Sequence, residues 1–226
     1  MRDIPSKFAL SAIFALAITF TFSCSGGGGD DDGGTSSNGG TSSPSSGVGN
    51  NKCTDIANCK KKQIGSQNWL AENLNIDVSG SVCYDNKESN CNTYGRLYTW
   101  EAAMSACPNG WHLPDTTEWN ALVTSVGGSS TAGKHLKAKE GWNSCGPTGS
   151  GESYSCEDTY GFSALPGGYG NSSGDFYDVG NDGNWWSASE YSSSGADLRY
   201  MSYDDEYVYY GNFDKDYLFS VRCVQD

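Results

Sequence analysis

From residue 53 onward the sequence predicts a single domain that combines helices with antiparallel strands and is held together by disulfides. Three observations predict it. Two stretches carry apolar residues at the i, i+3, i+4 and i+7 spacing of amphipathic helices. The last thirty or so residues contain three strand candidates separated by acidic turns. Eight cysteines are spread through the same region.

The first helix is expected to begin after Thr99, which suits an N-cap, and to end before Pro108. The second is expected to begin after Asp115, which forms a capping-box spacing with Glu118, and to end at Gly127. A third, short helix is expected within 132–139, a strand and a turn within 61–76, and strands at 198–203, 207–213 and 218–224.

The first 23 residues have the pattern of a bacterial signal peptide. Arg2 and Lys7 give a basic start, and an almost unbroken apolar run follows up to Phe22. This run is short for a helix that spans a bilayer. It ends at Cys24, at a place that resembles the lipobox, where a cysteine receives diacylglycerol. We expect the signal peptide to be removed and Cys24 to be lipidated, with ordinary cleavage as the alternative.

Residues 24–52 predict a flexible tether behind the lipidated cysteine. Gly, Ser, Thr, Asn and Asp dominate this stretch, and it cannot bury enough apolar surface to offset the entropy of ordering. Its acidic cluster, Asp30 to Asp32, resembles the surface-export signals of Bacteroidetes lipoproteins, with a solvated linker as the alternative. Lipid and tether together predict a domain displayed on the outer membrane at the cell surface.

The composition excludes some partners. The net charge is -13 with only 14 Lys plus Arg, so the positive field that binds phosphate backbones is missing and nucleic acid is not expected as a partner. Aromatic residues make up 13% of the chain, which indicates either a β-rich core or a binding face lined by rings.

The cysteines predict disulfides rather than a metal or redox site. There are nine, and setting aside Cys24 leaves an even number. No CxxC pair and no Cys/His cluster with zinc spacing is present, and exported chains meet oxidising conditions. The disulfide candidates are Cys53, Cys59, Cys83, Cys91, Cys107, Cys145, Cys156 and Cys223.

Six segments of the domain form a recognisable set: NWLAENLN (68–75), YGRLYTWEAAM (94–104), CPNGWHLPDTTEWNAL (107–122), GFSALPGGY (161–169), WWSASE (185–190) and SVRCV (220–224). Together they resemble the Fibrobacter succinogenes major paralogous domain family, over nearly all of residues 53–226. That family looks like a branch of the C-type-lectin-like superfamily, related to the formylglycine-generating enzyme fold. The resemblance implies an α+β C-type-lectin-like domain. Two main helices would flank small twisted antiparallel sheets, and long irregular loops would carry ligand sites.

The resemblance also implies one disulfide, because lectin-like domains join a cysteine on the first helix to one in the last strand. Cys107 and Cys223 occupy those places. The other six cysteines pair most simply with their neighbours, as 53 with 59, 83 with 91 and 145 with 156, although the sequence leaves other pairings open.

No catalytic residue is assigned, and we expect a protein without enzymatic activity. The only histidines are His112 and His135, and we interpret His112 as a structural residue at a helix entrance. No nucleophile with a base and an orienting group can be assembled. The reactive-cysteine motif of the formylglycine-generating relatives is absent, and the paired carboxylates cluster in turns.

One constellation suits ligand binding and comprises Asp175, Asp178, Asn181, Asp182, Asn184, Trp185 and Trp186. Carboxylate and amide oxygens on a loop are calcium ligands, so the three aspartates are candidate metal ligands and calcium is a possible cofactor. Exposed tryptophan rings stack against sugars. Ordinary turn formation and filling of the core are the alternatives.

A second constellation comprises Tyr200, Tyr203, Tyr207, Tyr209 and Tyr210. Side chains alternate between the two faces of a hairpin, so some of these rings must face solvent. Tyr203, Tyr207 and Tyr209, with Trp185 and Trp186, are the candidate ligand contacts.

These observations favour a noncatalytic binding or adhesion module on a lipid anchor, with polysaccharide or a surface protein as partner. Two other interpretations stay open. One is an exported enzyme on a scaffold like the formylglycine-generating enzyme. The other is a structural envelope protein without a small ligand.

Overall fold

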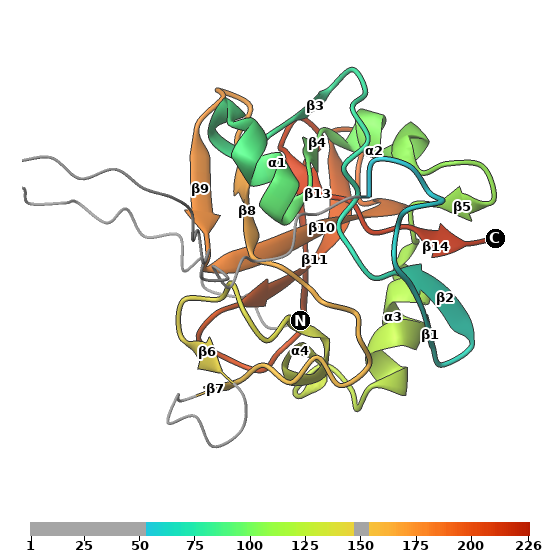
Figure 1. Ribbon diagram of the computed structural model, residues 1–226. Coiled ribbons are helices and arrows are strands. Elements are labelled where there is room, and N and C mark those ends of the chain that lie inside the picture. The colour runs from blue at the N-terminus through green and yellow to red at the C-terminus, as the bar shows by residue number, and fades with distance from the viewer. Residues whose placement is uncertain (1–52, 147–153) are drawn as a thin grey trace, which may run out of the picture. The chain divides into compact units, whose positions relative to one another are not determined.

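The computed structural model describes residues 53–146 and 154–226, so the predicted signal peptide, lipidation site and tether lie outside the described residues. The described chain is mostly β-structure (Figure 1), and its four α-helices have 7, 7, 10 and 5 residues. The expected α+β C-type-lectin-like fold with two main flanking helices is therefore wrong. The physical reason lies in the Gly- and aromatic-rich segment 167–190, which forms strands of a large sheet instead of irregular loops.

A curled sheet occupies the centre of the domain. Its longest strands, β10 (Asp182–Glu190) and β11 (Gly195–Ser202), pair antiparallel, and β12 (Tyr209–Asp214) follows on β11 at one edge. The other side of β10 pairs with β13 and also with β8. The remaining strands of this sheet are β3 (Ser81–Val82), β4 (Leu97–Tyr98), β8 (Gly167–Gly170), β9 (Phe176–Val179) and β13 (Phe219–Ser220).

A smaller sheet has the strand order β1-β2-β14-β5. Its strands are β1 (Lys61–Ile64), β2 (Gln67–Leu70), β5 (Trp111–His112) and β14 (Val224–Gln225), and a separate two-stranded sheet pairs β6 (Cys145–Gly146) with β7 (Tyr154–Ser155). The single strand expected at 218–224 is thus split between the two larger sheets. The backbone between β13 and β14 is held by hydrogen bonds from Leu74 N to Val221 O, at 2.9 Å, and from Leu70 N to Cys223 O, at 3.0 Å.

The two expected helices are confirmed, together with their caps. In α2 (Trp100–Ala106), the side chain of Thr99 accepts a hydrogen bond from Ala102 N. In α3 (Thr116–Ser125), Asp115 and Glu118 form the reciprocal capping box. The third helix, α4 (Ala132–Leu136), is shorter than expected, and α1 (Glu88–Tyr94) with the 3-10 turn η1 (Tyr84–Asn86) was not predicted. Within the described ranges, no helix has both the length and the apolar character needed to cross a bilayer.

Strand register separates the side chains of the curled sheet into two faces. Trp186 on β10 lies opposite Leu198 on β11, and the next pair on that face is Asn184 with Tyr200. Across the next strand, Tyr200 lies opposite Tyr209. The other face carries the rows Trp185, Arg199, Tyr210 and Gly183, Met201.

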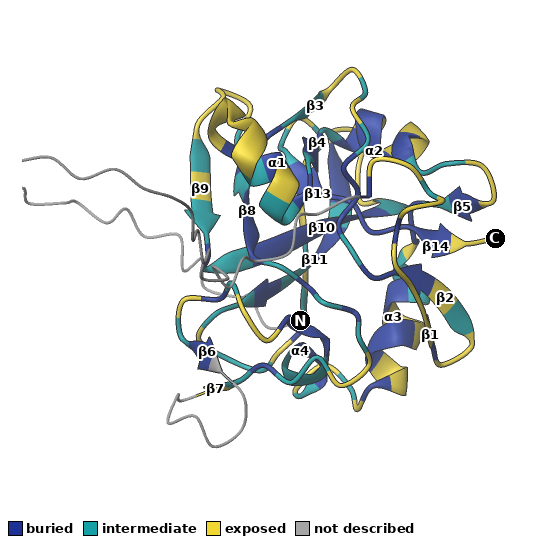
Figure 2. Cartoon of the chain, viewed as in Figure 1, coloured by how far each residue is buried: buried dark blue, intermediate teal, exposed yellow. Residues whose placement is uncertain are grey.

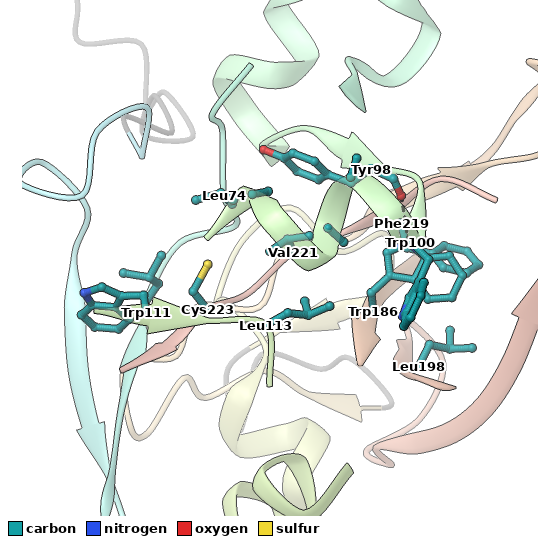
Figure 3. Packing of buried hydrophobic residues seen from close by; sticks show 14 of the residues in the cluster. Leu74, Tyr98, Trp100, Trp111, Leu113, Trp186, Leu198, Phe219, Val221 and Cys223 are labelled. Atoms are coloured by element: carbon teal, nitrogen blue, oxygen red, sulfur yellow. Dashed lines mark hydrogen bonds between the residues drawn. The ribbon is translucent and has the colours of Figure 1, made fainter. Parts of the chain in front are cut away.

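Each face covers its own hydrophobic cluster. Trp186 and Leu198 belong to a cluster in which Trp186 packs on Phe219 with ring centroids 4.5 Å apart (Figure 3). Trp185 and Met201 belong to the second cluster, beneath α3. Because both of its faces are covered, β10 is buried along most of its length, whereas the strand ends and turns are exposed (Figure 2). The second cluster also includes Trp69, Trp119, Leu122, Phe162 and Val224.

Four disulfides staple the described residues. Cys107, which directly follows α2, is bonded to Cys223 across a sequence separation of 116. The other three close short loops, joining Cys53 to Cys59, Cys83 to Cys91 and Cys145 to Cys156. These are the pairings that the sequence analysis favoured.

Candidate functional site

Trp185 and Trp186, two of the predicted ligand contacts, are fully buried. Consecutive residues of a strand point to opposite faces, so each ring enters a different cluster. Trp185 Nε1 donates to Asn73 Oδ1 at 2.9 Å, and Trp186 Nε1 donates to Tyr98 O at 2.8 Å. Both side chains are 0% exposed. Neither ring has a face open to a ligand, and both serve the core.

The predicted tyrosines behave differently, because three rings stack beside the turn that joins β11 to β12. Tyr200 and Tyr209 form a cross-strand pair with ring centroids 4.8 Å apart and an interplanar angle of 16°. Tyr207 stacks on Tyr209 at 5.5 Å and 19°. Tyr207 is 45% exposed, so the stack extends from the sheet to the surface.

A second stack lies on β8 and β9 and was missed by the sequence analysis. Tyr169 and Tyr177 are cross-strand partners whose ring centroids lie 5.3 Å apart at 28°, and Tyr217 stacks on Tyr169 at 6.3 Å and 25°. Tyr169 and Tyr217 pack against the cluster that contains Trp186, as Tyr200 does. The alternation of aromatic and glycine residues in 167–170 was the available signal for this pair of strands.

Carboxylates accompany the rings. Asp205 accepts hydrogen bonds from Tyr209 OH, at 2.8 Å, and from Tyr207 N, at 2.9 Å. Burial raises the pKa of Asp182 to about 6, and the charges of neighbouring aspartates add to this effect. Burial raises the pKa of Tyr200 and that of Tyr169, the latter to about 12, and the charge of Asp182 adds to both. We call the surface formed by Tyr169, Tyr177, Asp182, Tyr200, Asp205, Tyr207 and Tyr209 the tyrosine–aspartate face.

Lys137, which the sequence analysis did not single out, supports this surface from behind. It is fully buried, and its Nζ donates to the carbonyl oxygens of Ser202, at the end of β11, and of Asp205, within the β11–β12 turn. The ammonium lies 4.8 Å from the centroid of the Trp142 ring. Burial lowers the pKa of Lys137 to about 8, against the opposing effect of nearby carboxylates. Lys137 therefore fixes the turn that carries Asp205.

The three predicted calcium ligands do not converge. Asp175 lies in the turn before β9, where it accepts a hydrogen bond from Asn171 Nδ2 at 3.3 Å. Asp182 is hydrogen-bonded to the side chain of Ser202. Among the described residues, the one group of three His, Cys, Asp or Glu side chains with ligand atoms within 4.8 Å of one another is Cys83, Glu88 and Cys91, and its two cysteines are joined in a disulfide. A calcium site at Asp175, Asp178 and Asp182 gains no support from this arrangement.

Tyr203 and the two histidines have other partners and take no part in the tyrosine stacks. Tyr203 packs against the cluster that contains Trp185. His112 is held between Asp226, 2.6 Å from Nδ1, and Glu118, 2.9 Å from Nε2. Burial lowers the pKa of His112, but these two hydrogen bonds outweigh it, and the net shift is upward. Its place next to the α3 capping box fits the structural role expected for it, and His135 contacts Thr159 at 3.0 Å.

A buried polar network joins the segments on which the family resemblance rests. Asn73 Oδ1 accepts hydrogen bonds from Trp185 Nε1 and from Arg222 Nη2, at 2.9 and 2.8 Å. Arg222 also donates to the carbonyl oxygens of Leu70, Phe162 and Ser163. Asn73 and Arg222 are 0% exposed, so this network holds the fold and offers no contact to a ligand. Neither residue was predicted from the sequence as a buried polar group, although a polar residue inside an apolar segment was the available signal for one.

Comparisons with known proteins agree with this assignment of motifs. The profile of the Fibrobacter succinogenes major domain matches residues 63–225. Neither the curated proteins nor the solved structures contain a significant match to the chain. Because the matched range covers most of the sequence and nearly all of the described domain, the chain belongs to the Fibrobacter succinogenes major domain family.

Proposed function

We propose that the protein is a noncatalytic binding module on the cell surface, which attaches to polysaccharide through its tyrosine–aspartate face. The observation that carries the proposal is the stack of Tyr200, Tyr209 and Tyr207 beside the carboxylate of Asp205. In this proposal a lipid on Cys24 anchors the chain in the outer membrane, and residues 24–52 tether the domain to it.

The chemistry of this face suits sugars. The apolar C–H face of a sugar ring packs against tyrosine rings, and carboxylate oxygens accept hydrogen bonds from sugar hydroxyls. The stack is already ordered by the cross-strand pairing of Tyr200 with Tyr209 and by the hydrogen bond of Tyr209 to Asp205. Binding therefore immobilises few side chains, which favours affinity.

The cysteines support a binding role over thiol-based oxidative chemistry. Every cysteine of the described residues is in a disulfide, which leaves none as a reactive thiol there. A hydrolytic enzyme and a purely structural envelope protein are the remaining alternatives, and the binding experiment distinguishes them from the proposal.

The experiment uses the mature chain in pulldowns with insoluble plant-wall and microbial polysaccharides. We expect binding to at least one polymer, and a five- to tenfold weaker affinity, the equivalent of about 1 kcal/mol, for Tyr207→Ala and for Tyr209→Ala. Tyr191→Ala is the matched control, because Tyr191 is 66% exposed but lies at the opposite end of the β10–β11 pair, in the turn that joins these strands. Equal losses in all three variants, or no binding to any polymer, contradict the proposal. Release of sugar from a bound polymer would instead show a hydrolase.

The anchoring part of the proposal has its own test. Cells that express the chain are labelled with a radioactive fatty acid, and surface exposure is measured by protease treatment of intact cells. The native chain should carry label and be cleaved, while Cys24→Ser should carry none and appear in the medium or periplasm. A native chain without label contradicts the lipid anchor.

A further inference from the structure

We propose that the tyrosine–aspartate face selects polysaccharides without acidic groups and rejects polyuronates, because its carboxylates are fixed beside the rings on which a sugar would stack. This inference rests on the proposed function and adds the substrate class. It concerns a specificity that aromatic stacking alone would not produce, since neutral and acidic sugars present similar C–H faces.

The position of Asp205 is fixed by its contacts. Its two carboxylate oxygens accept hydrogen bonds from Tyr207 N and Tyr209 OH, and its own carbonyl oxygen accepts one from Lys137 Nζ. These contacts hold the carboxylate beside the ring stack, and moving it away would break its hydrogen bonds to Tyr207 N and Tyr209 OH. A sugar bound on Tyr207 or Tyr209 would lie close to this charge.

A second carboxylate, Asp182, lies at the start of β10, opposite Ser202 on β11. It neighbours Gly183, whose partner on β8 is Gly168, so it sits between the strands that carry Tyr200 and Tyr169. The charge of Asp182 acts on Tyr200 in one stack and on Tyr169 in the other. Asp178 and Asp204 act on Asp182 in turn, so the negative charges of this region form one group. A chain that crosses the face from one stack to the other meets negative charge along its path.

Two cations close to the face, Lys137 and Arg199, point away from the ligand side. Lys137 offsets part of the charge, but its ammonium is buried against the Trp142 ring and backbone carbonyls. Arg199 belongs to the opposite face of the sheet, where its Nη2 donates to Asn120 Oδ1 at 2.7 Å and its guanidinium lies beside the Tyr210 ring. Neither cation is placed to pair with a carboxylate of the ligand.

The physical consequence is repulsion that depends on salt. A polyuronate carries a carboxylate on each sugar, and like charges at the surface repel most strongly at low ionic strength, where the screening length is about 30 Å at 0.01 M. We expect polyuronates to bind at least about tenfold more weakly than a neutral polymer at low salt, with the difference shrinking in 0.5 M salt.

The experiment is affinity electrophoresis of the mature chain in gels that contain one soluble polymer each: a neutral xylan or β-glucan, chitosan, or polygalacturonate. Retardation by a neutral polymer and not by polygalacturonate at low salt supports the inference. Equal or stronger retardation by polygalacturonate overturns it and leaves the proposed function standing. No retardation by any polymer overturns both. Retardation by chitosan alone that vanishes with salt indicates nonspecific charge attraction and overturns both as well.

A pair of charge-reversal variants tests whether the charges of this face, rather than the net charge of the chain, set the selectivity. Asp204 is exposed in the turn beside the stack and acts on Asp182. Asp214 is equally exposed, but its place in the alternation of β12 puts it on the face opposite to Tyr209. We expect polygalacturonate to retard the Asp204→Lys variant measurably at low salt, and the Asp214→Lys variant to behave like the native chain. Equal gains in both variants overturn the inference.

Discussion

Arg222 Nη2 donates a hydrogen bond to Asn73 Oδ1 at 2.8 Å, across a separation of 149 residues. Both side chains are wholly buried, and burial lowers the pKa of Arg222 to about 9. Arg222 also lies over the Phe162 ring, at 4.2 Å from its centroid. Residues from four of the recognisable family segments, which contain Asn73, Phe162, Trp185 and Arg222, thus meet at one place. Their common role is to join distant parts of the chain.

Removal of the Asn73 side chain should destabilise the domain strongly. Asn73→Ala leaves Trp185 Nε1 without its acceptor in the core and leaves Arg222 Nη2 with only the longer hydrogen bond to Ser163 O, and we expect a loss of about 2–4 kcal/mol in the free energy of unfolding. Urea unfolding under oxidising conditions measures it. Asn212→Ala, at an exposed position of β12, is the control and should change stability by less than about 0.5 kcal/mol. Similar losses in both variants would show that the loss of stability does not come from the buried network of Asn73.

Gly168 should tolerate no side chain. Its φ is +66°, and a Cβ atom there would lie 2.3 Å from Tyr177 O and 2.7 Å from Val179 N, so the pairing of β8 with β9 would have to break. We expect Gly168→Ala to lower stability by more than about 3 kcal/mol. Gly174→Ala is the matched control, because Gly174 has a φ of +89° with open space around it, and about 1 kcal/mol is expected there. Thermal unfolding of the two variants side by side measures the contrast. Equal costs would mean that backbone strain alone, and not the close approach, matters at Gly168.

The long-range disulfide should contribute more than a short one. Replacing Cys107 and Cys223 together by alanine removes a link across 116 residues, for which loop entropy predicts a loss of about 5 kcal/mol. The same replacement of Cys53 and Cys59, which are six residues apart, should lose only about 2 kcal/mol. Chemical unfolding of both double variants tests the order. A larger loss for the short link would contradict the loop-entropy account.

The stability of the domain should decrease as the pH rises from about 4 to about 6, because Asp182 loses its proton in this range. The folded state holds the proton of Asp182 up to a pKa of about 6, while the unfolded chain releases it near the ordinary aspartate pKa of 3.8. The folded state binds more protons than the unfolded chain in this window. The stabilising contribution of the protonated Asp182 carboxyl is therefore complete below pH 4 and is lost as the pH rises through 6. Asp182→Asn should therefore be more stable than the native chain at pH 7, by about 1–3 kcal/mol, and nearly equal to it at pH 4. Urea unfolding at several pH values measures the difference, with the exposed Asp214→Asn as control. A difference that is the same at pH 4 and pH 7 would exclude titration of Asp182 as its cause.

Local signals in the sequence predicted two of the helices, α2 and α3. Thr99 and the Asp115–Glu118 pair mark helix starts because their side chains bond to backbone groups only three residues away. The hairpin of β11 and β12 was expected for a similar reason, since an acidic turn separates two strand-forming segments. By contrast, the split of 218–224 between two sheets depends on hydrogen bonds to Leu70 and Leu74, about 150 residues away.

The candidate site shows the same division. Strand alternation indicated that some tyrosines of 200–210 face outward, but not that Tyr200, Tyr209 and Tyr207 stack or that Tyr169 shares their face. Trp185 and Trp186 were considered as ligand contacts because exposed tryptophan rings stack against sugars. Only the packing of both sheet faces shows that these two rings are buried.

By itself, then, the sequence determined the capped helices, the family and the set of cysteines available for disulfides, because each depends on short-range chemistry or on residue identity. The tertiary structure decided the mostly β architecture, the burial of Trp185 and Trp186, and the meeting of Asp182 and Asp205 with the tyrosine rings. These features arise where strands far apart in the chain pair in a particular register. A shift of one residue in that register would turn each side chain of the strand to the other face.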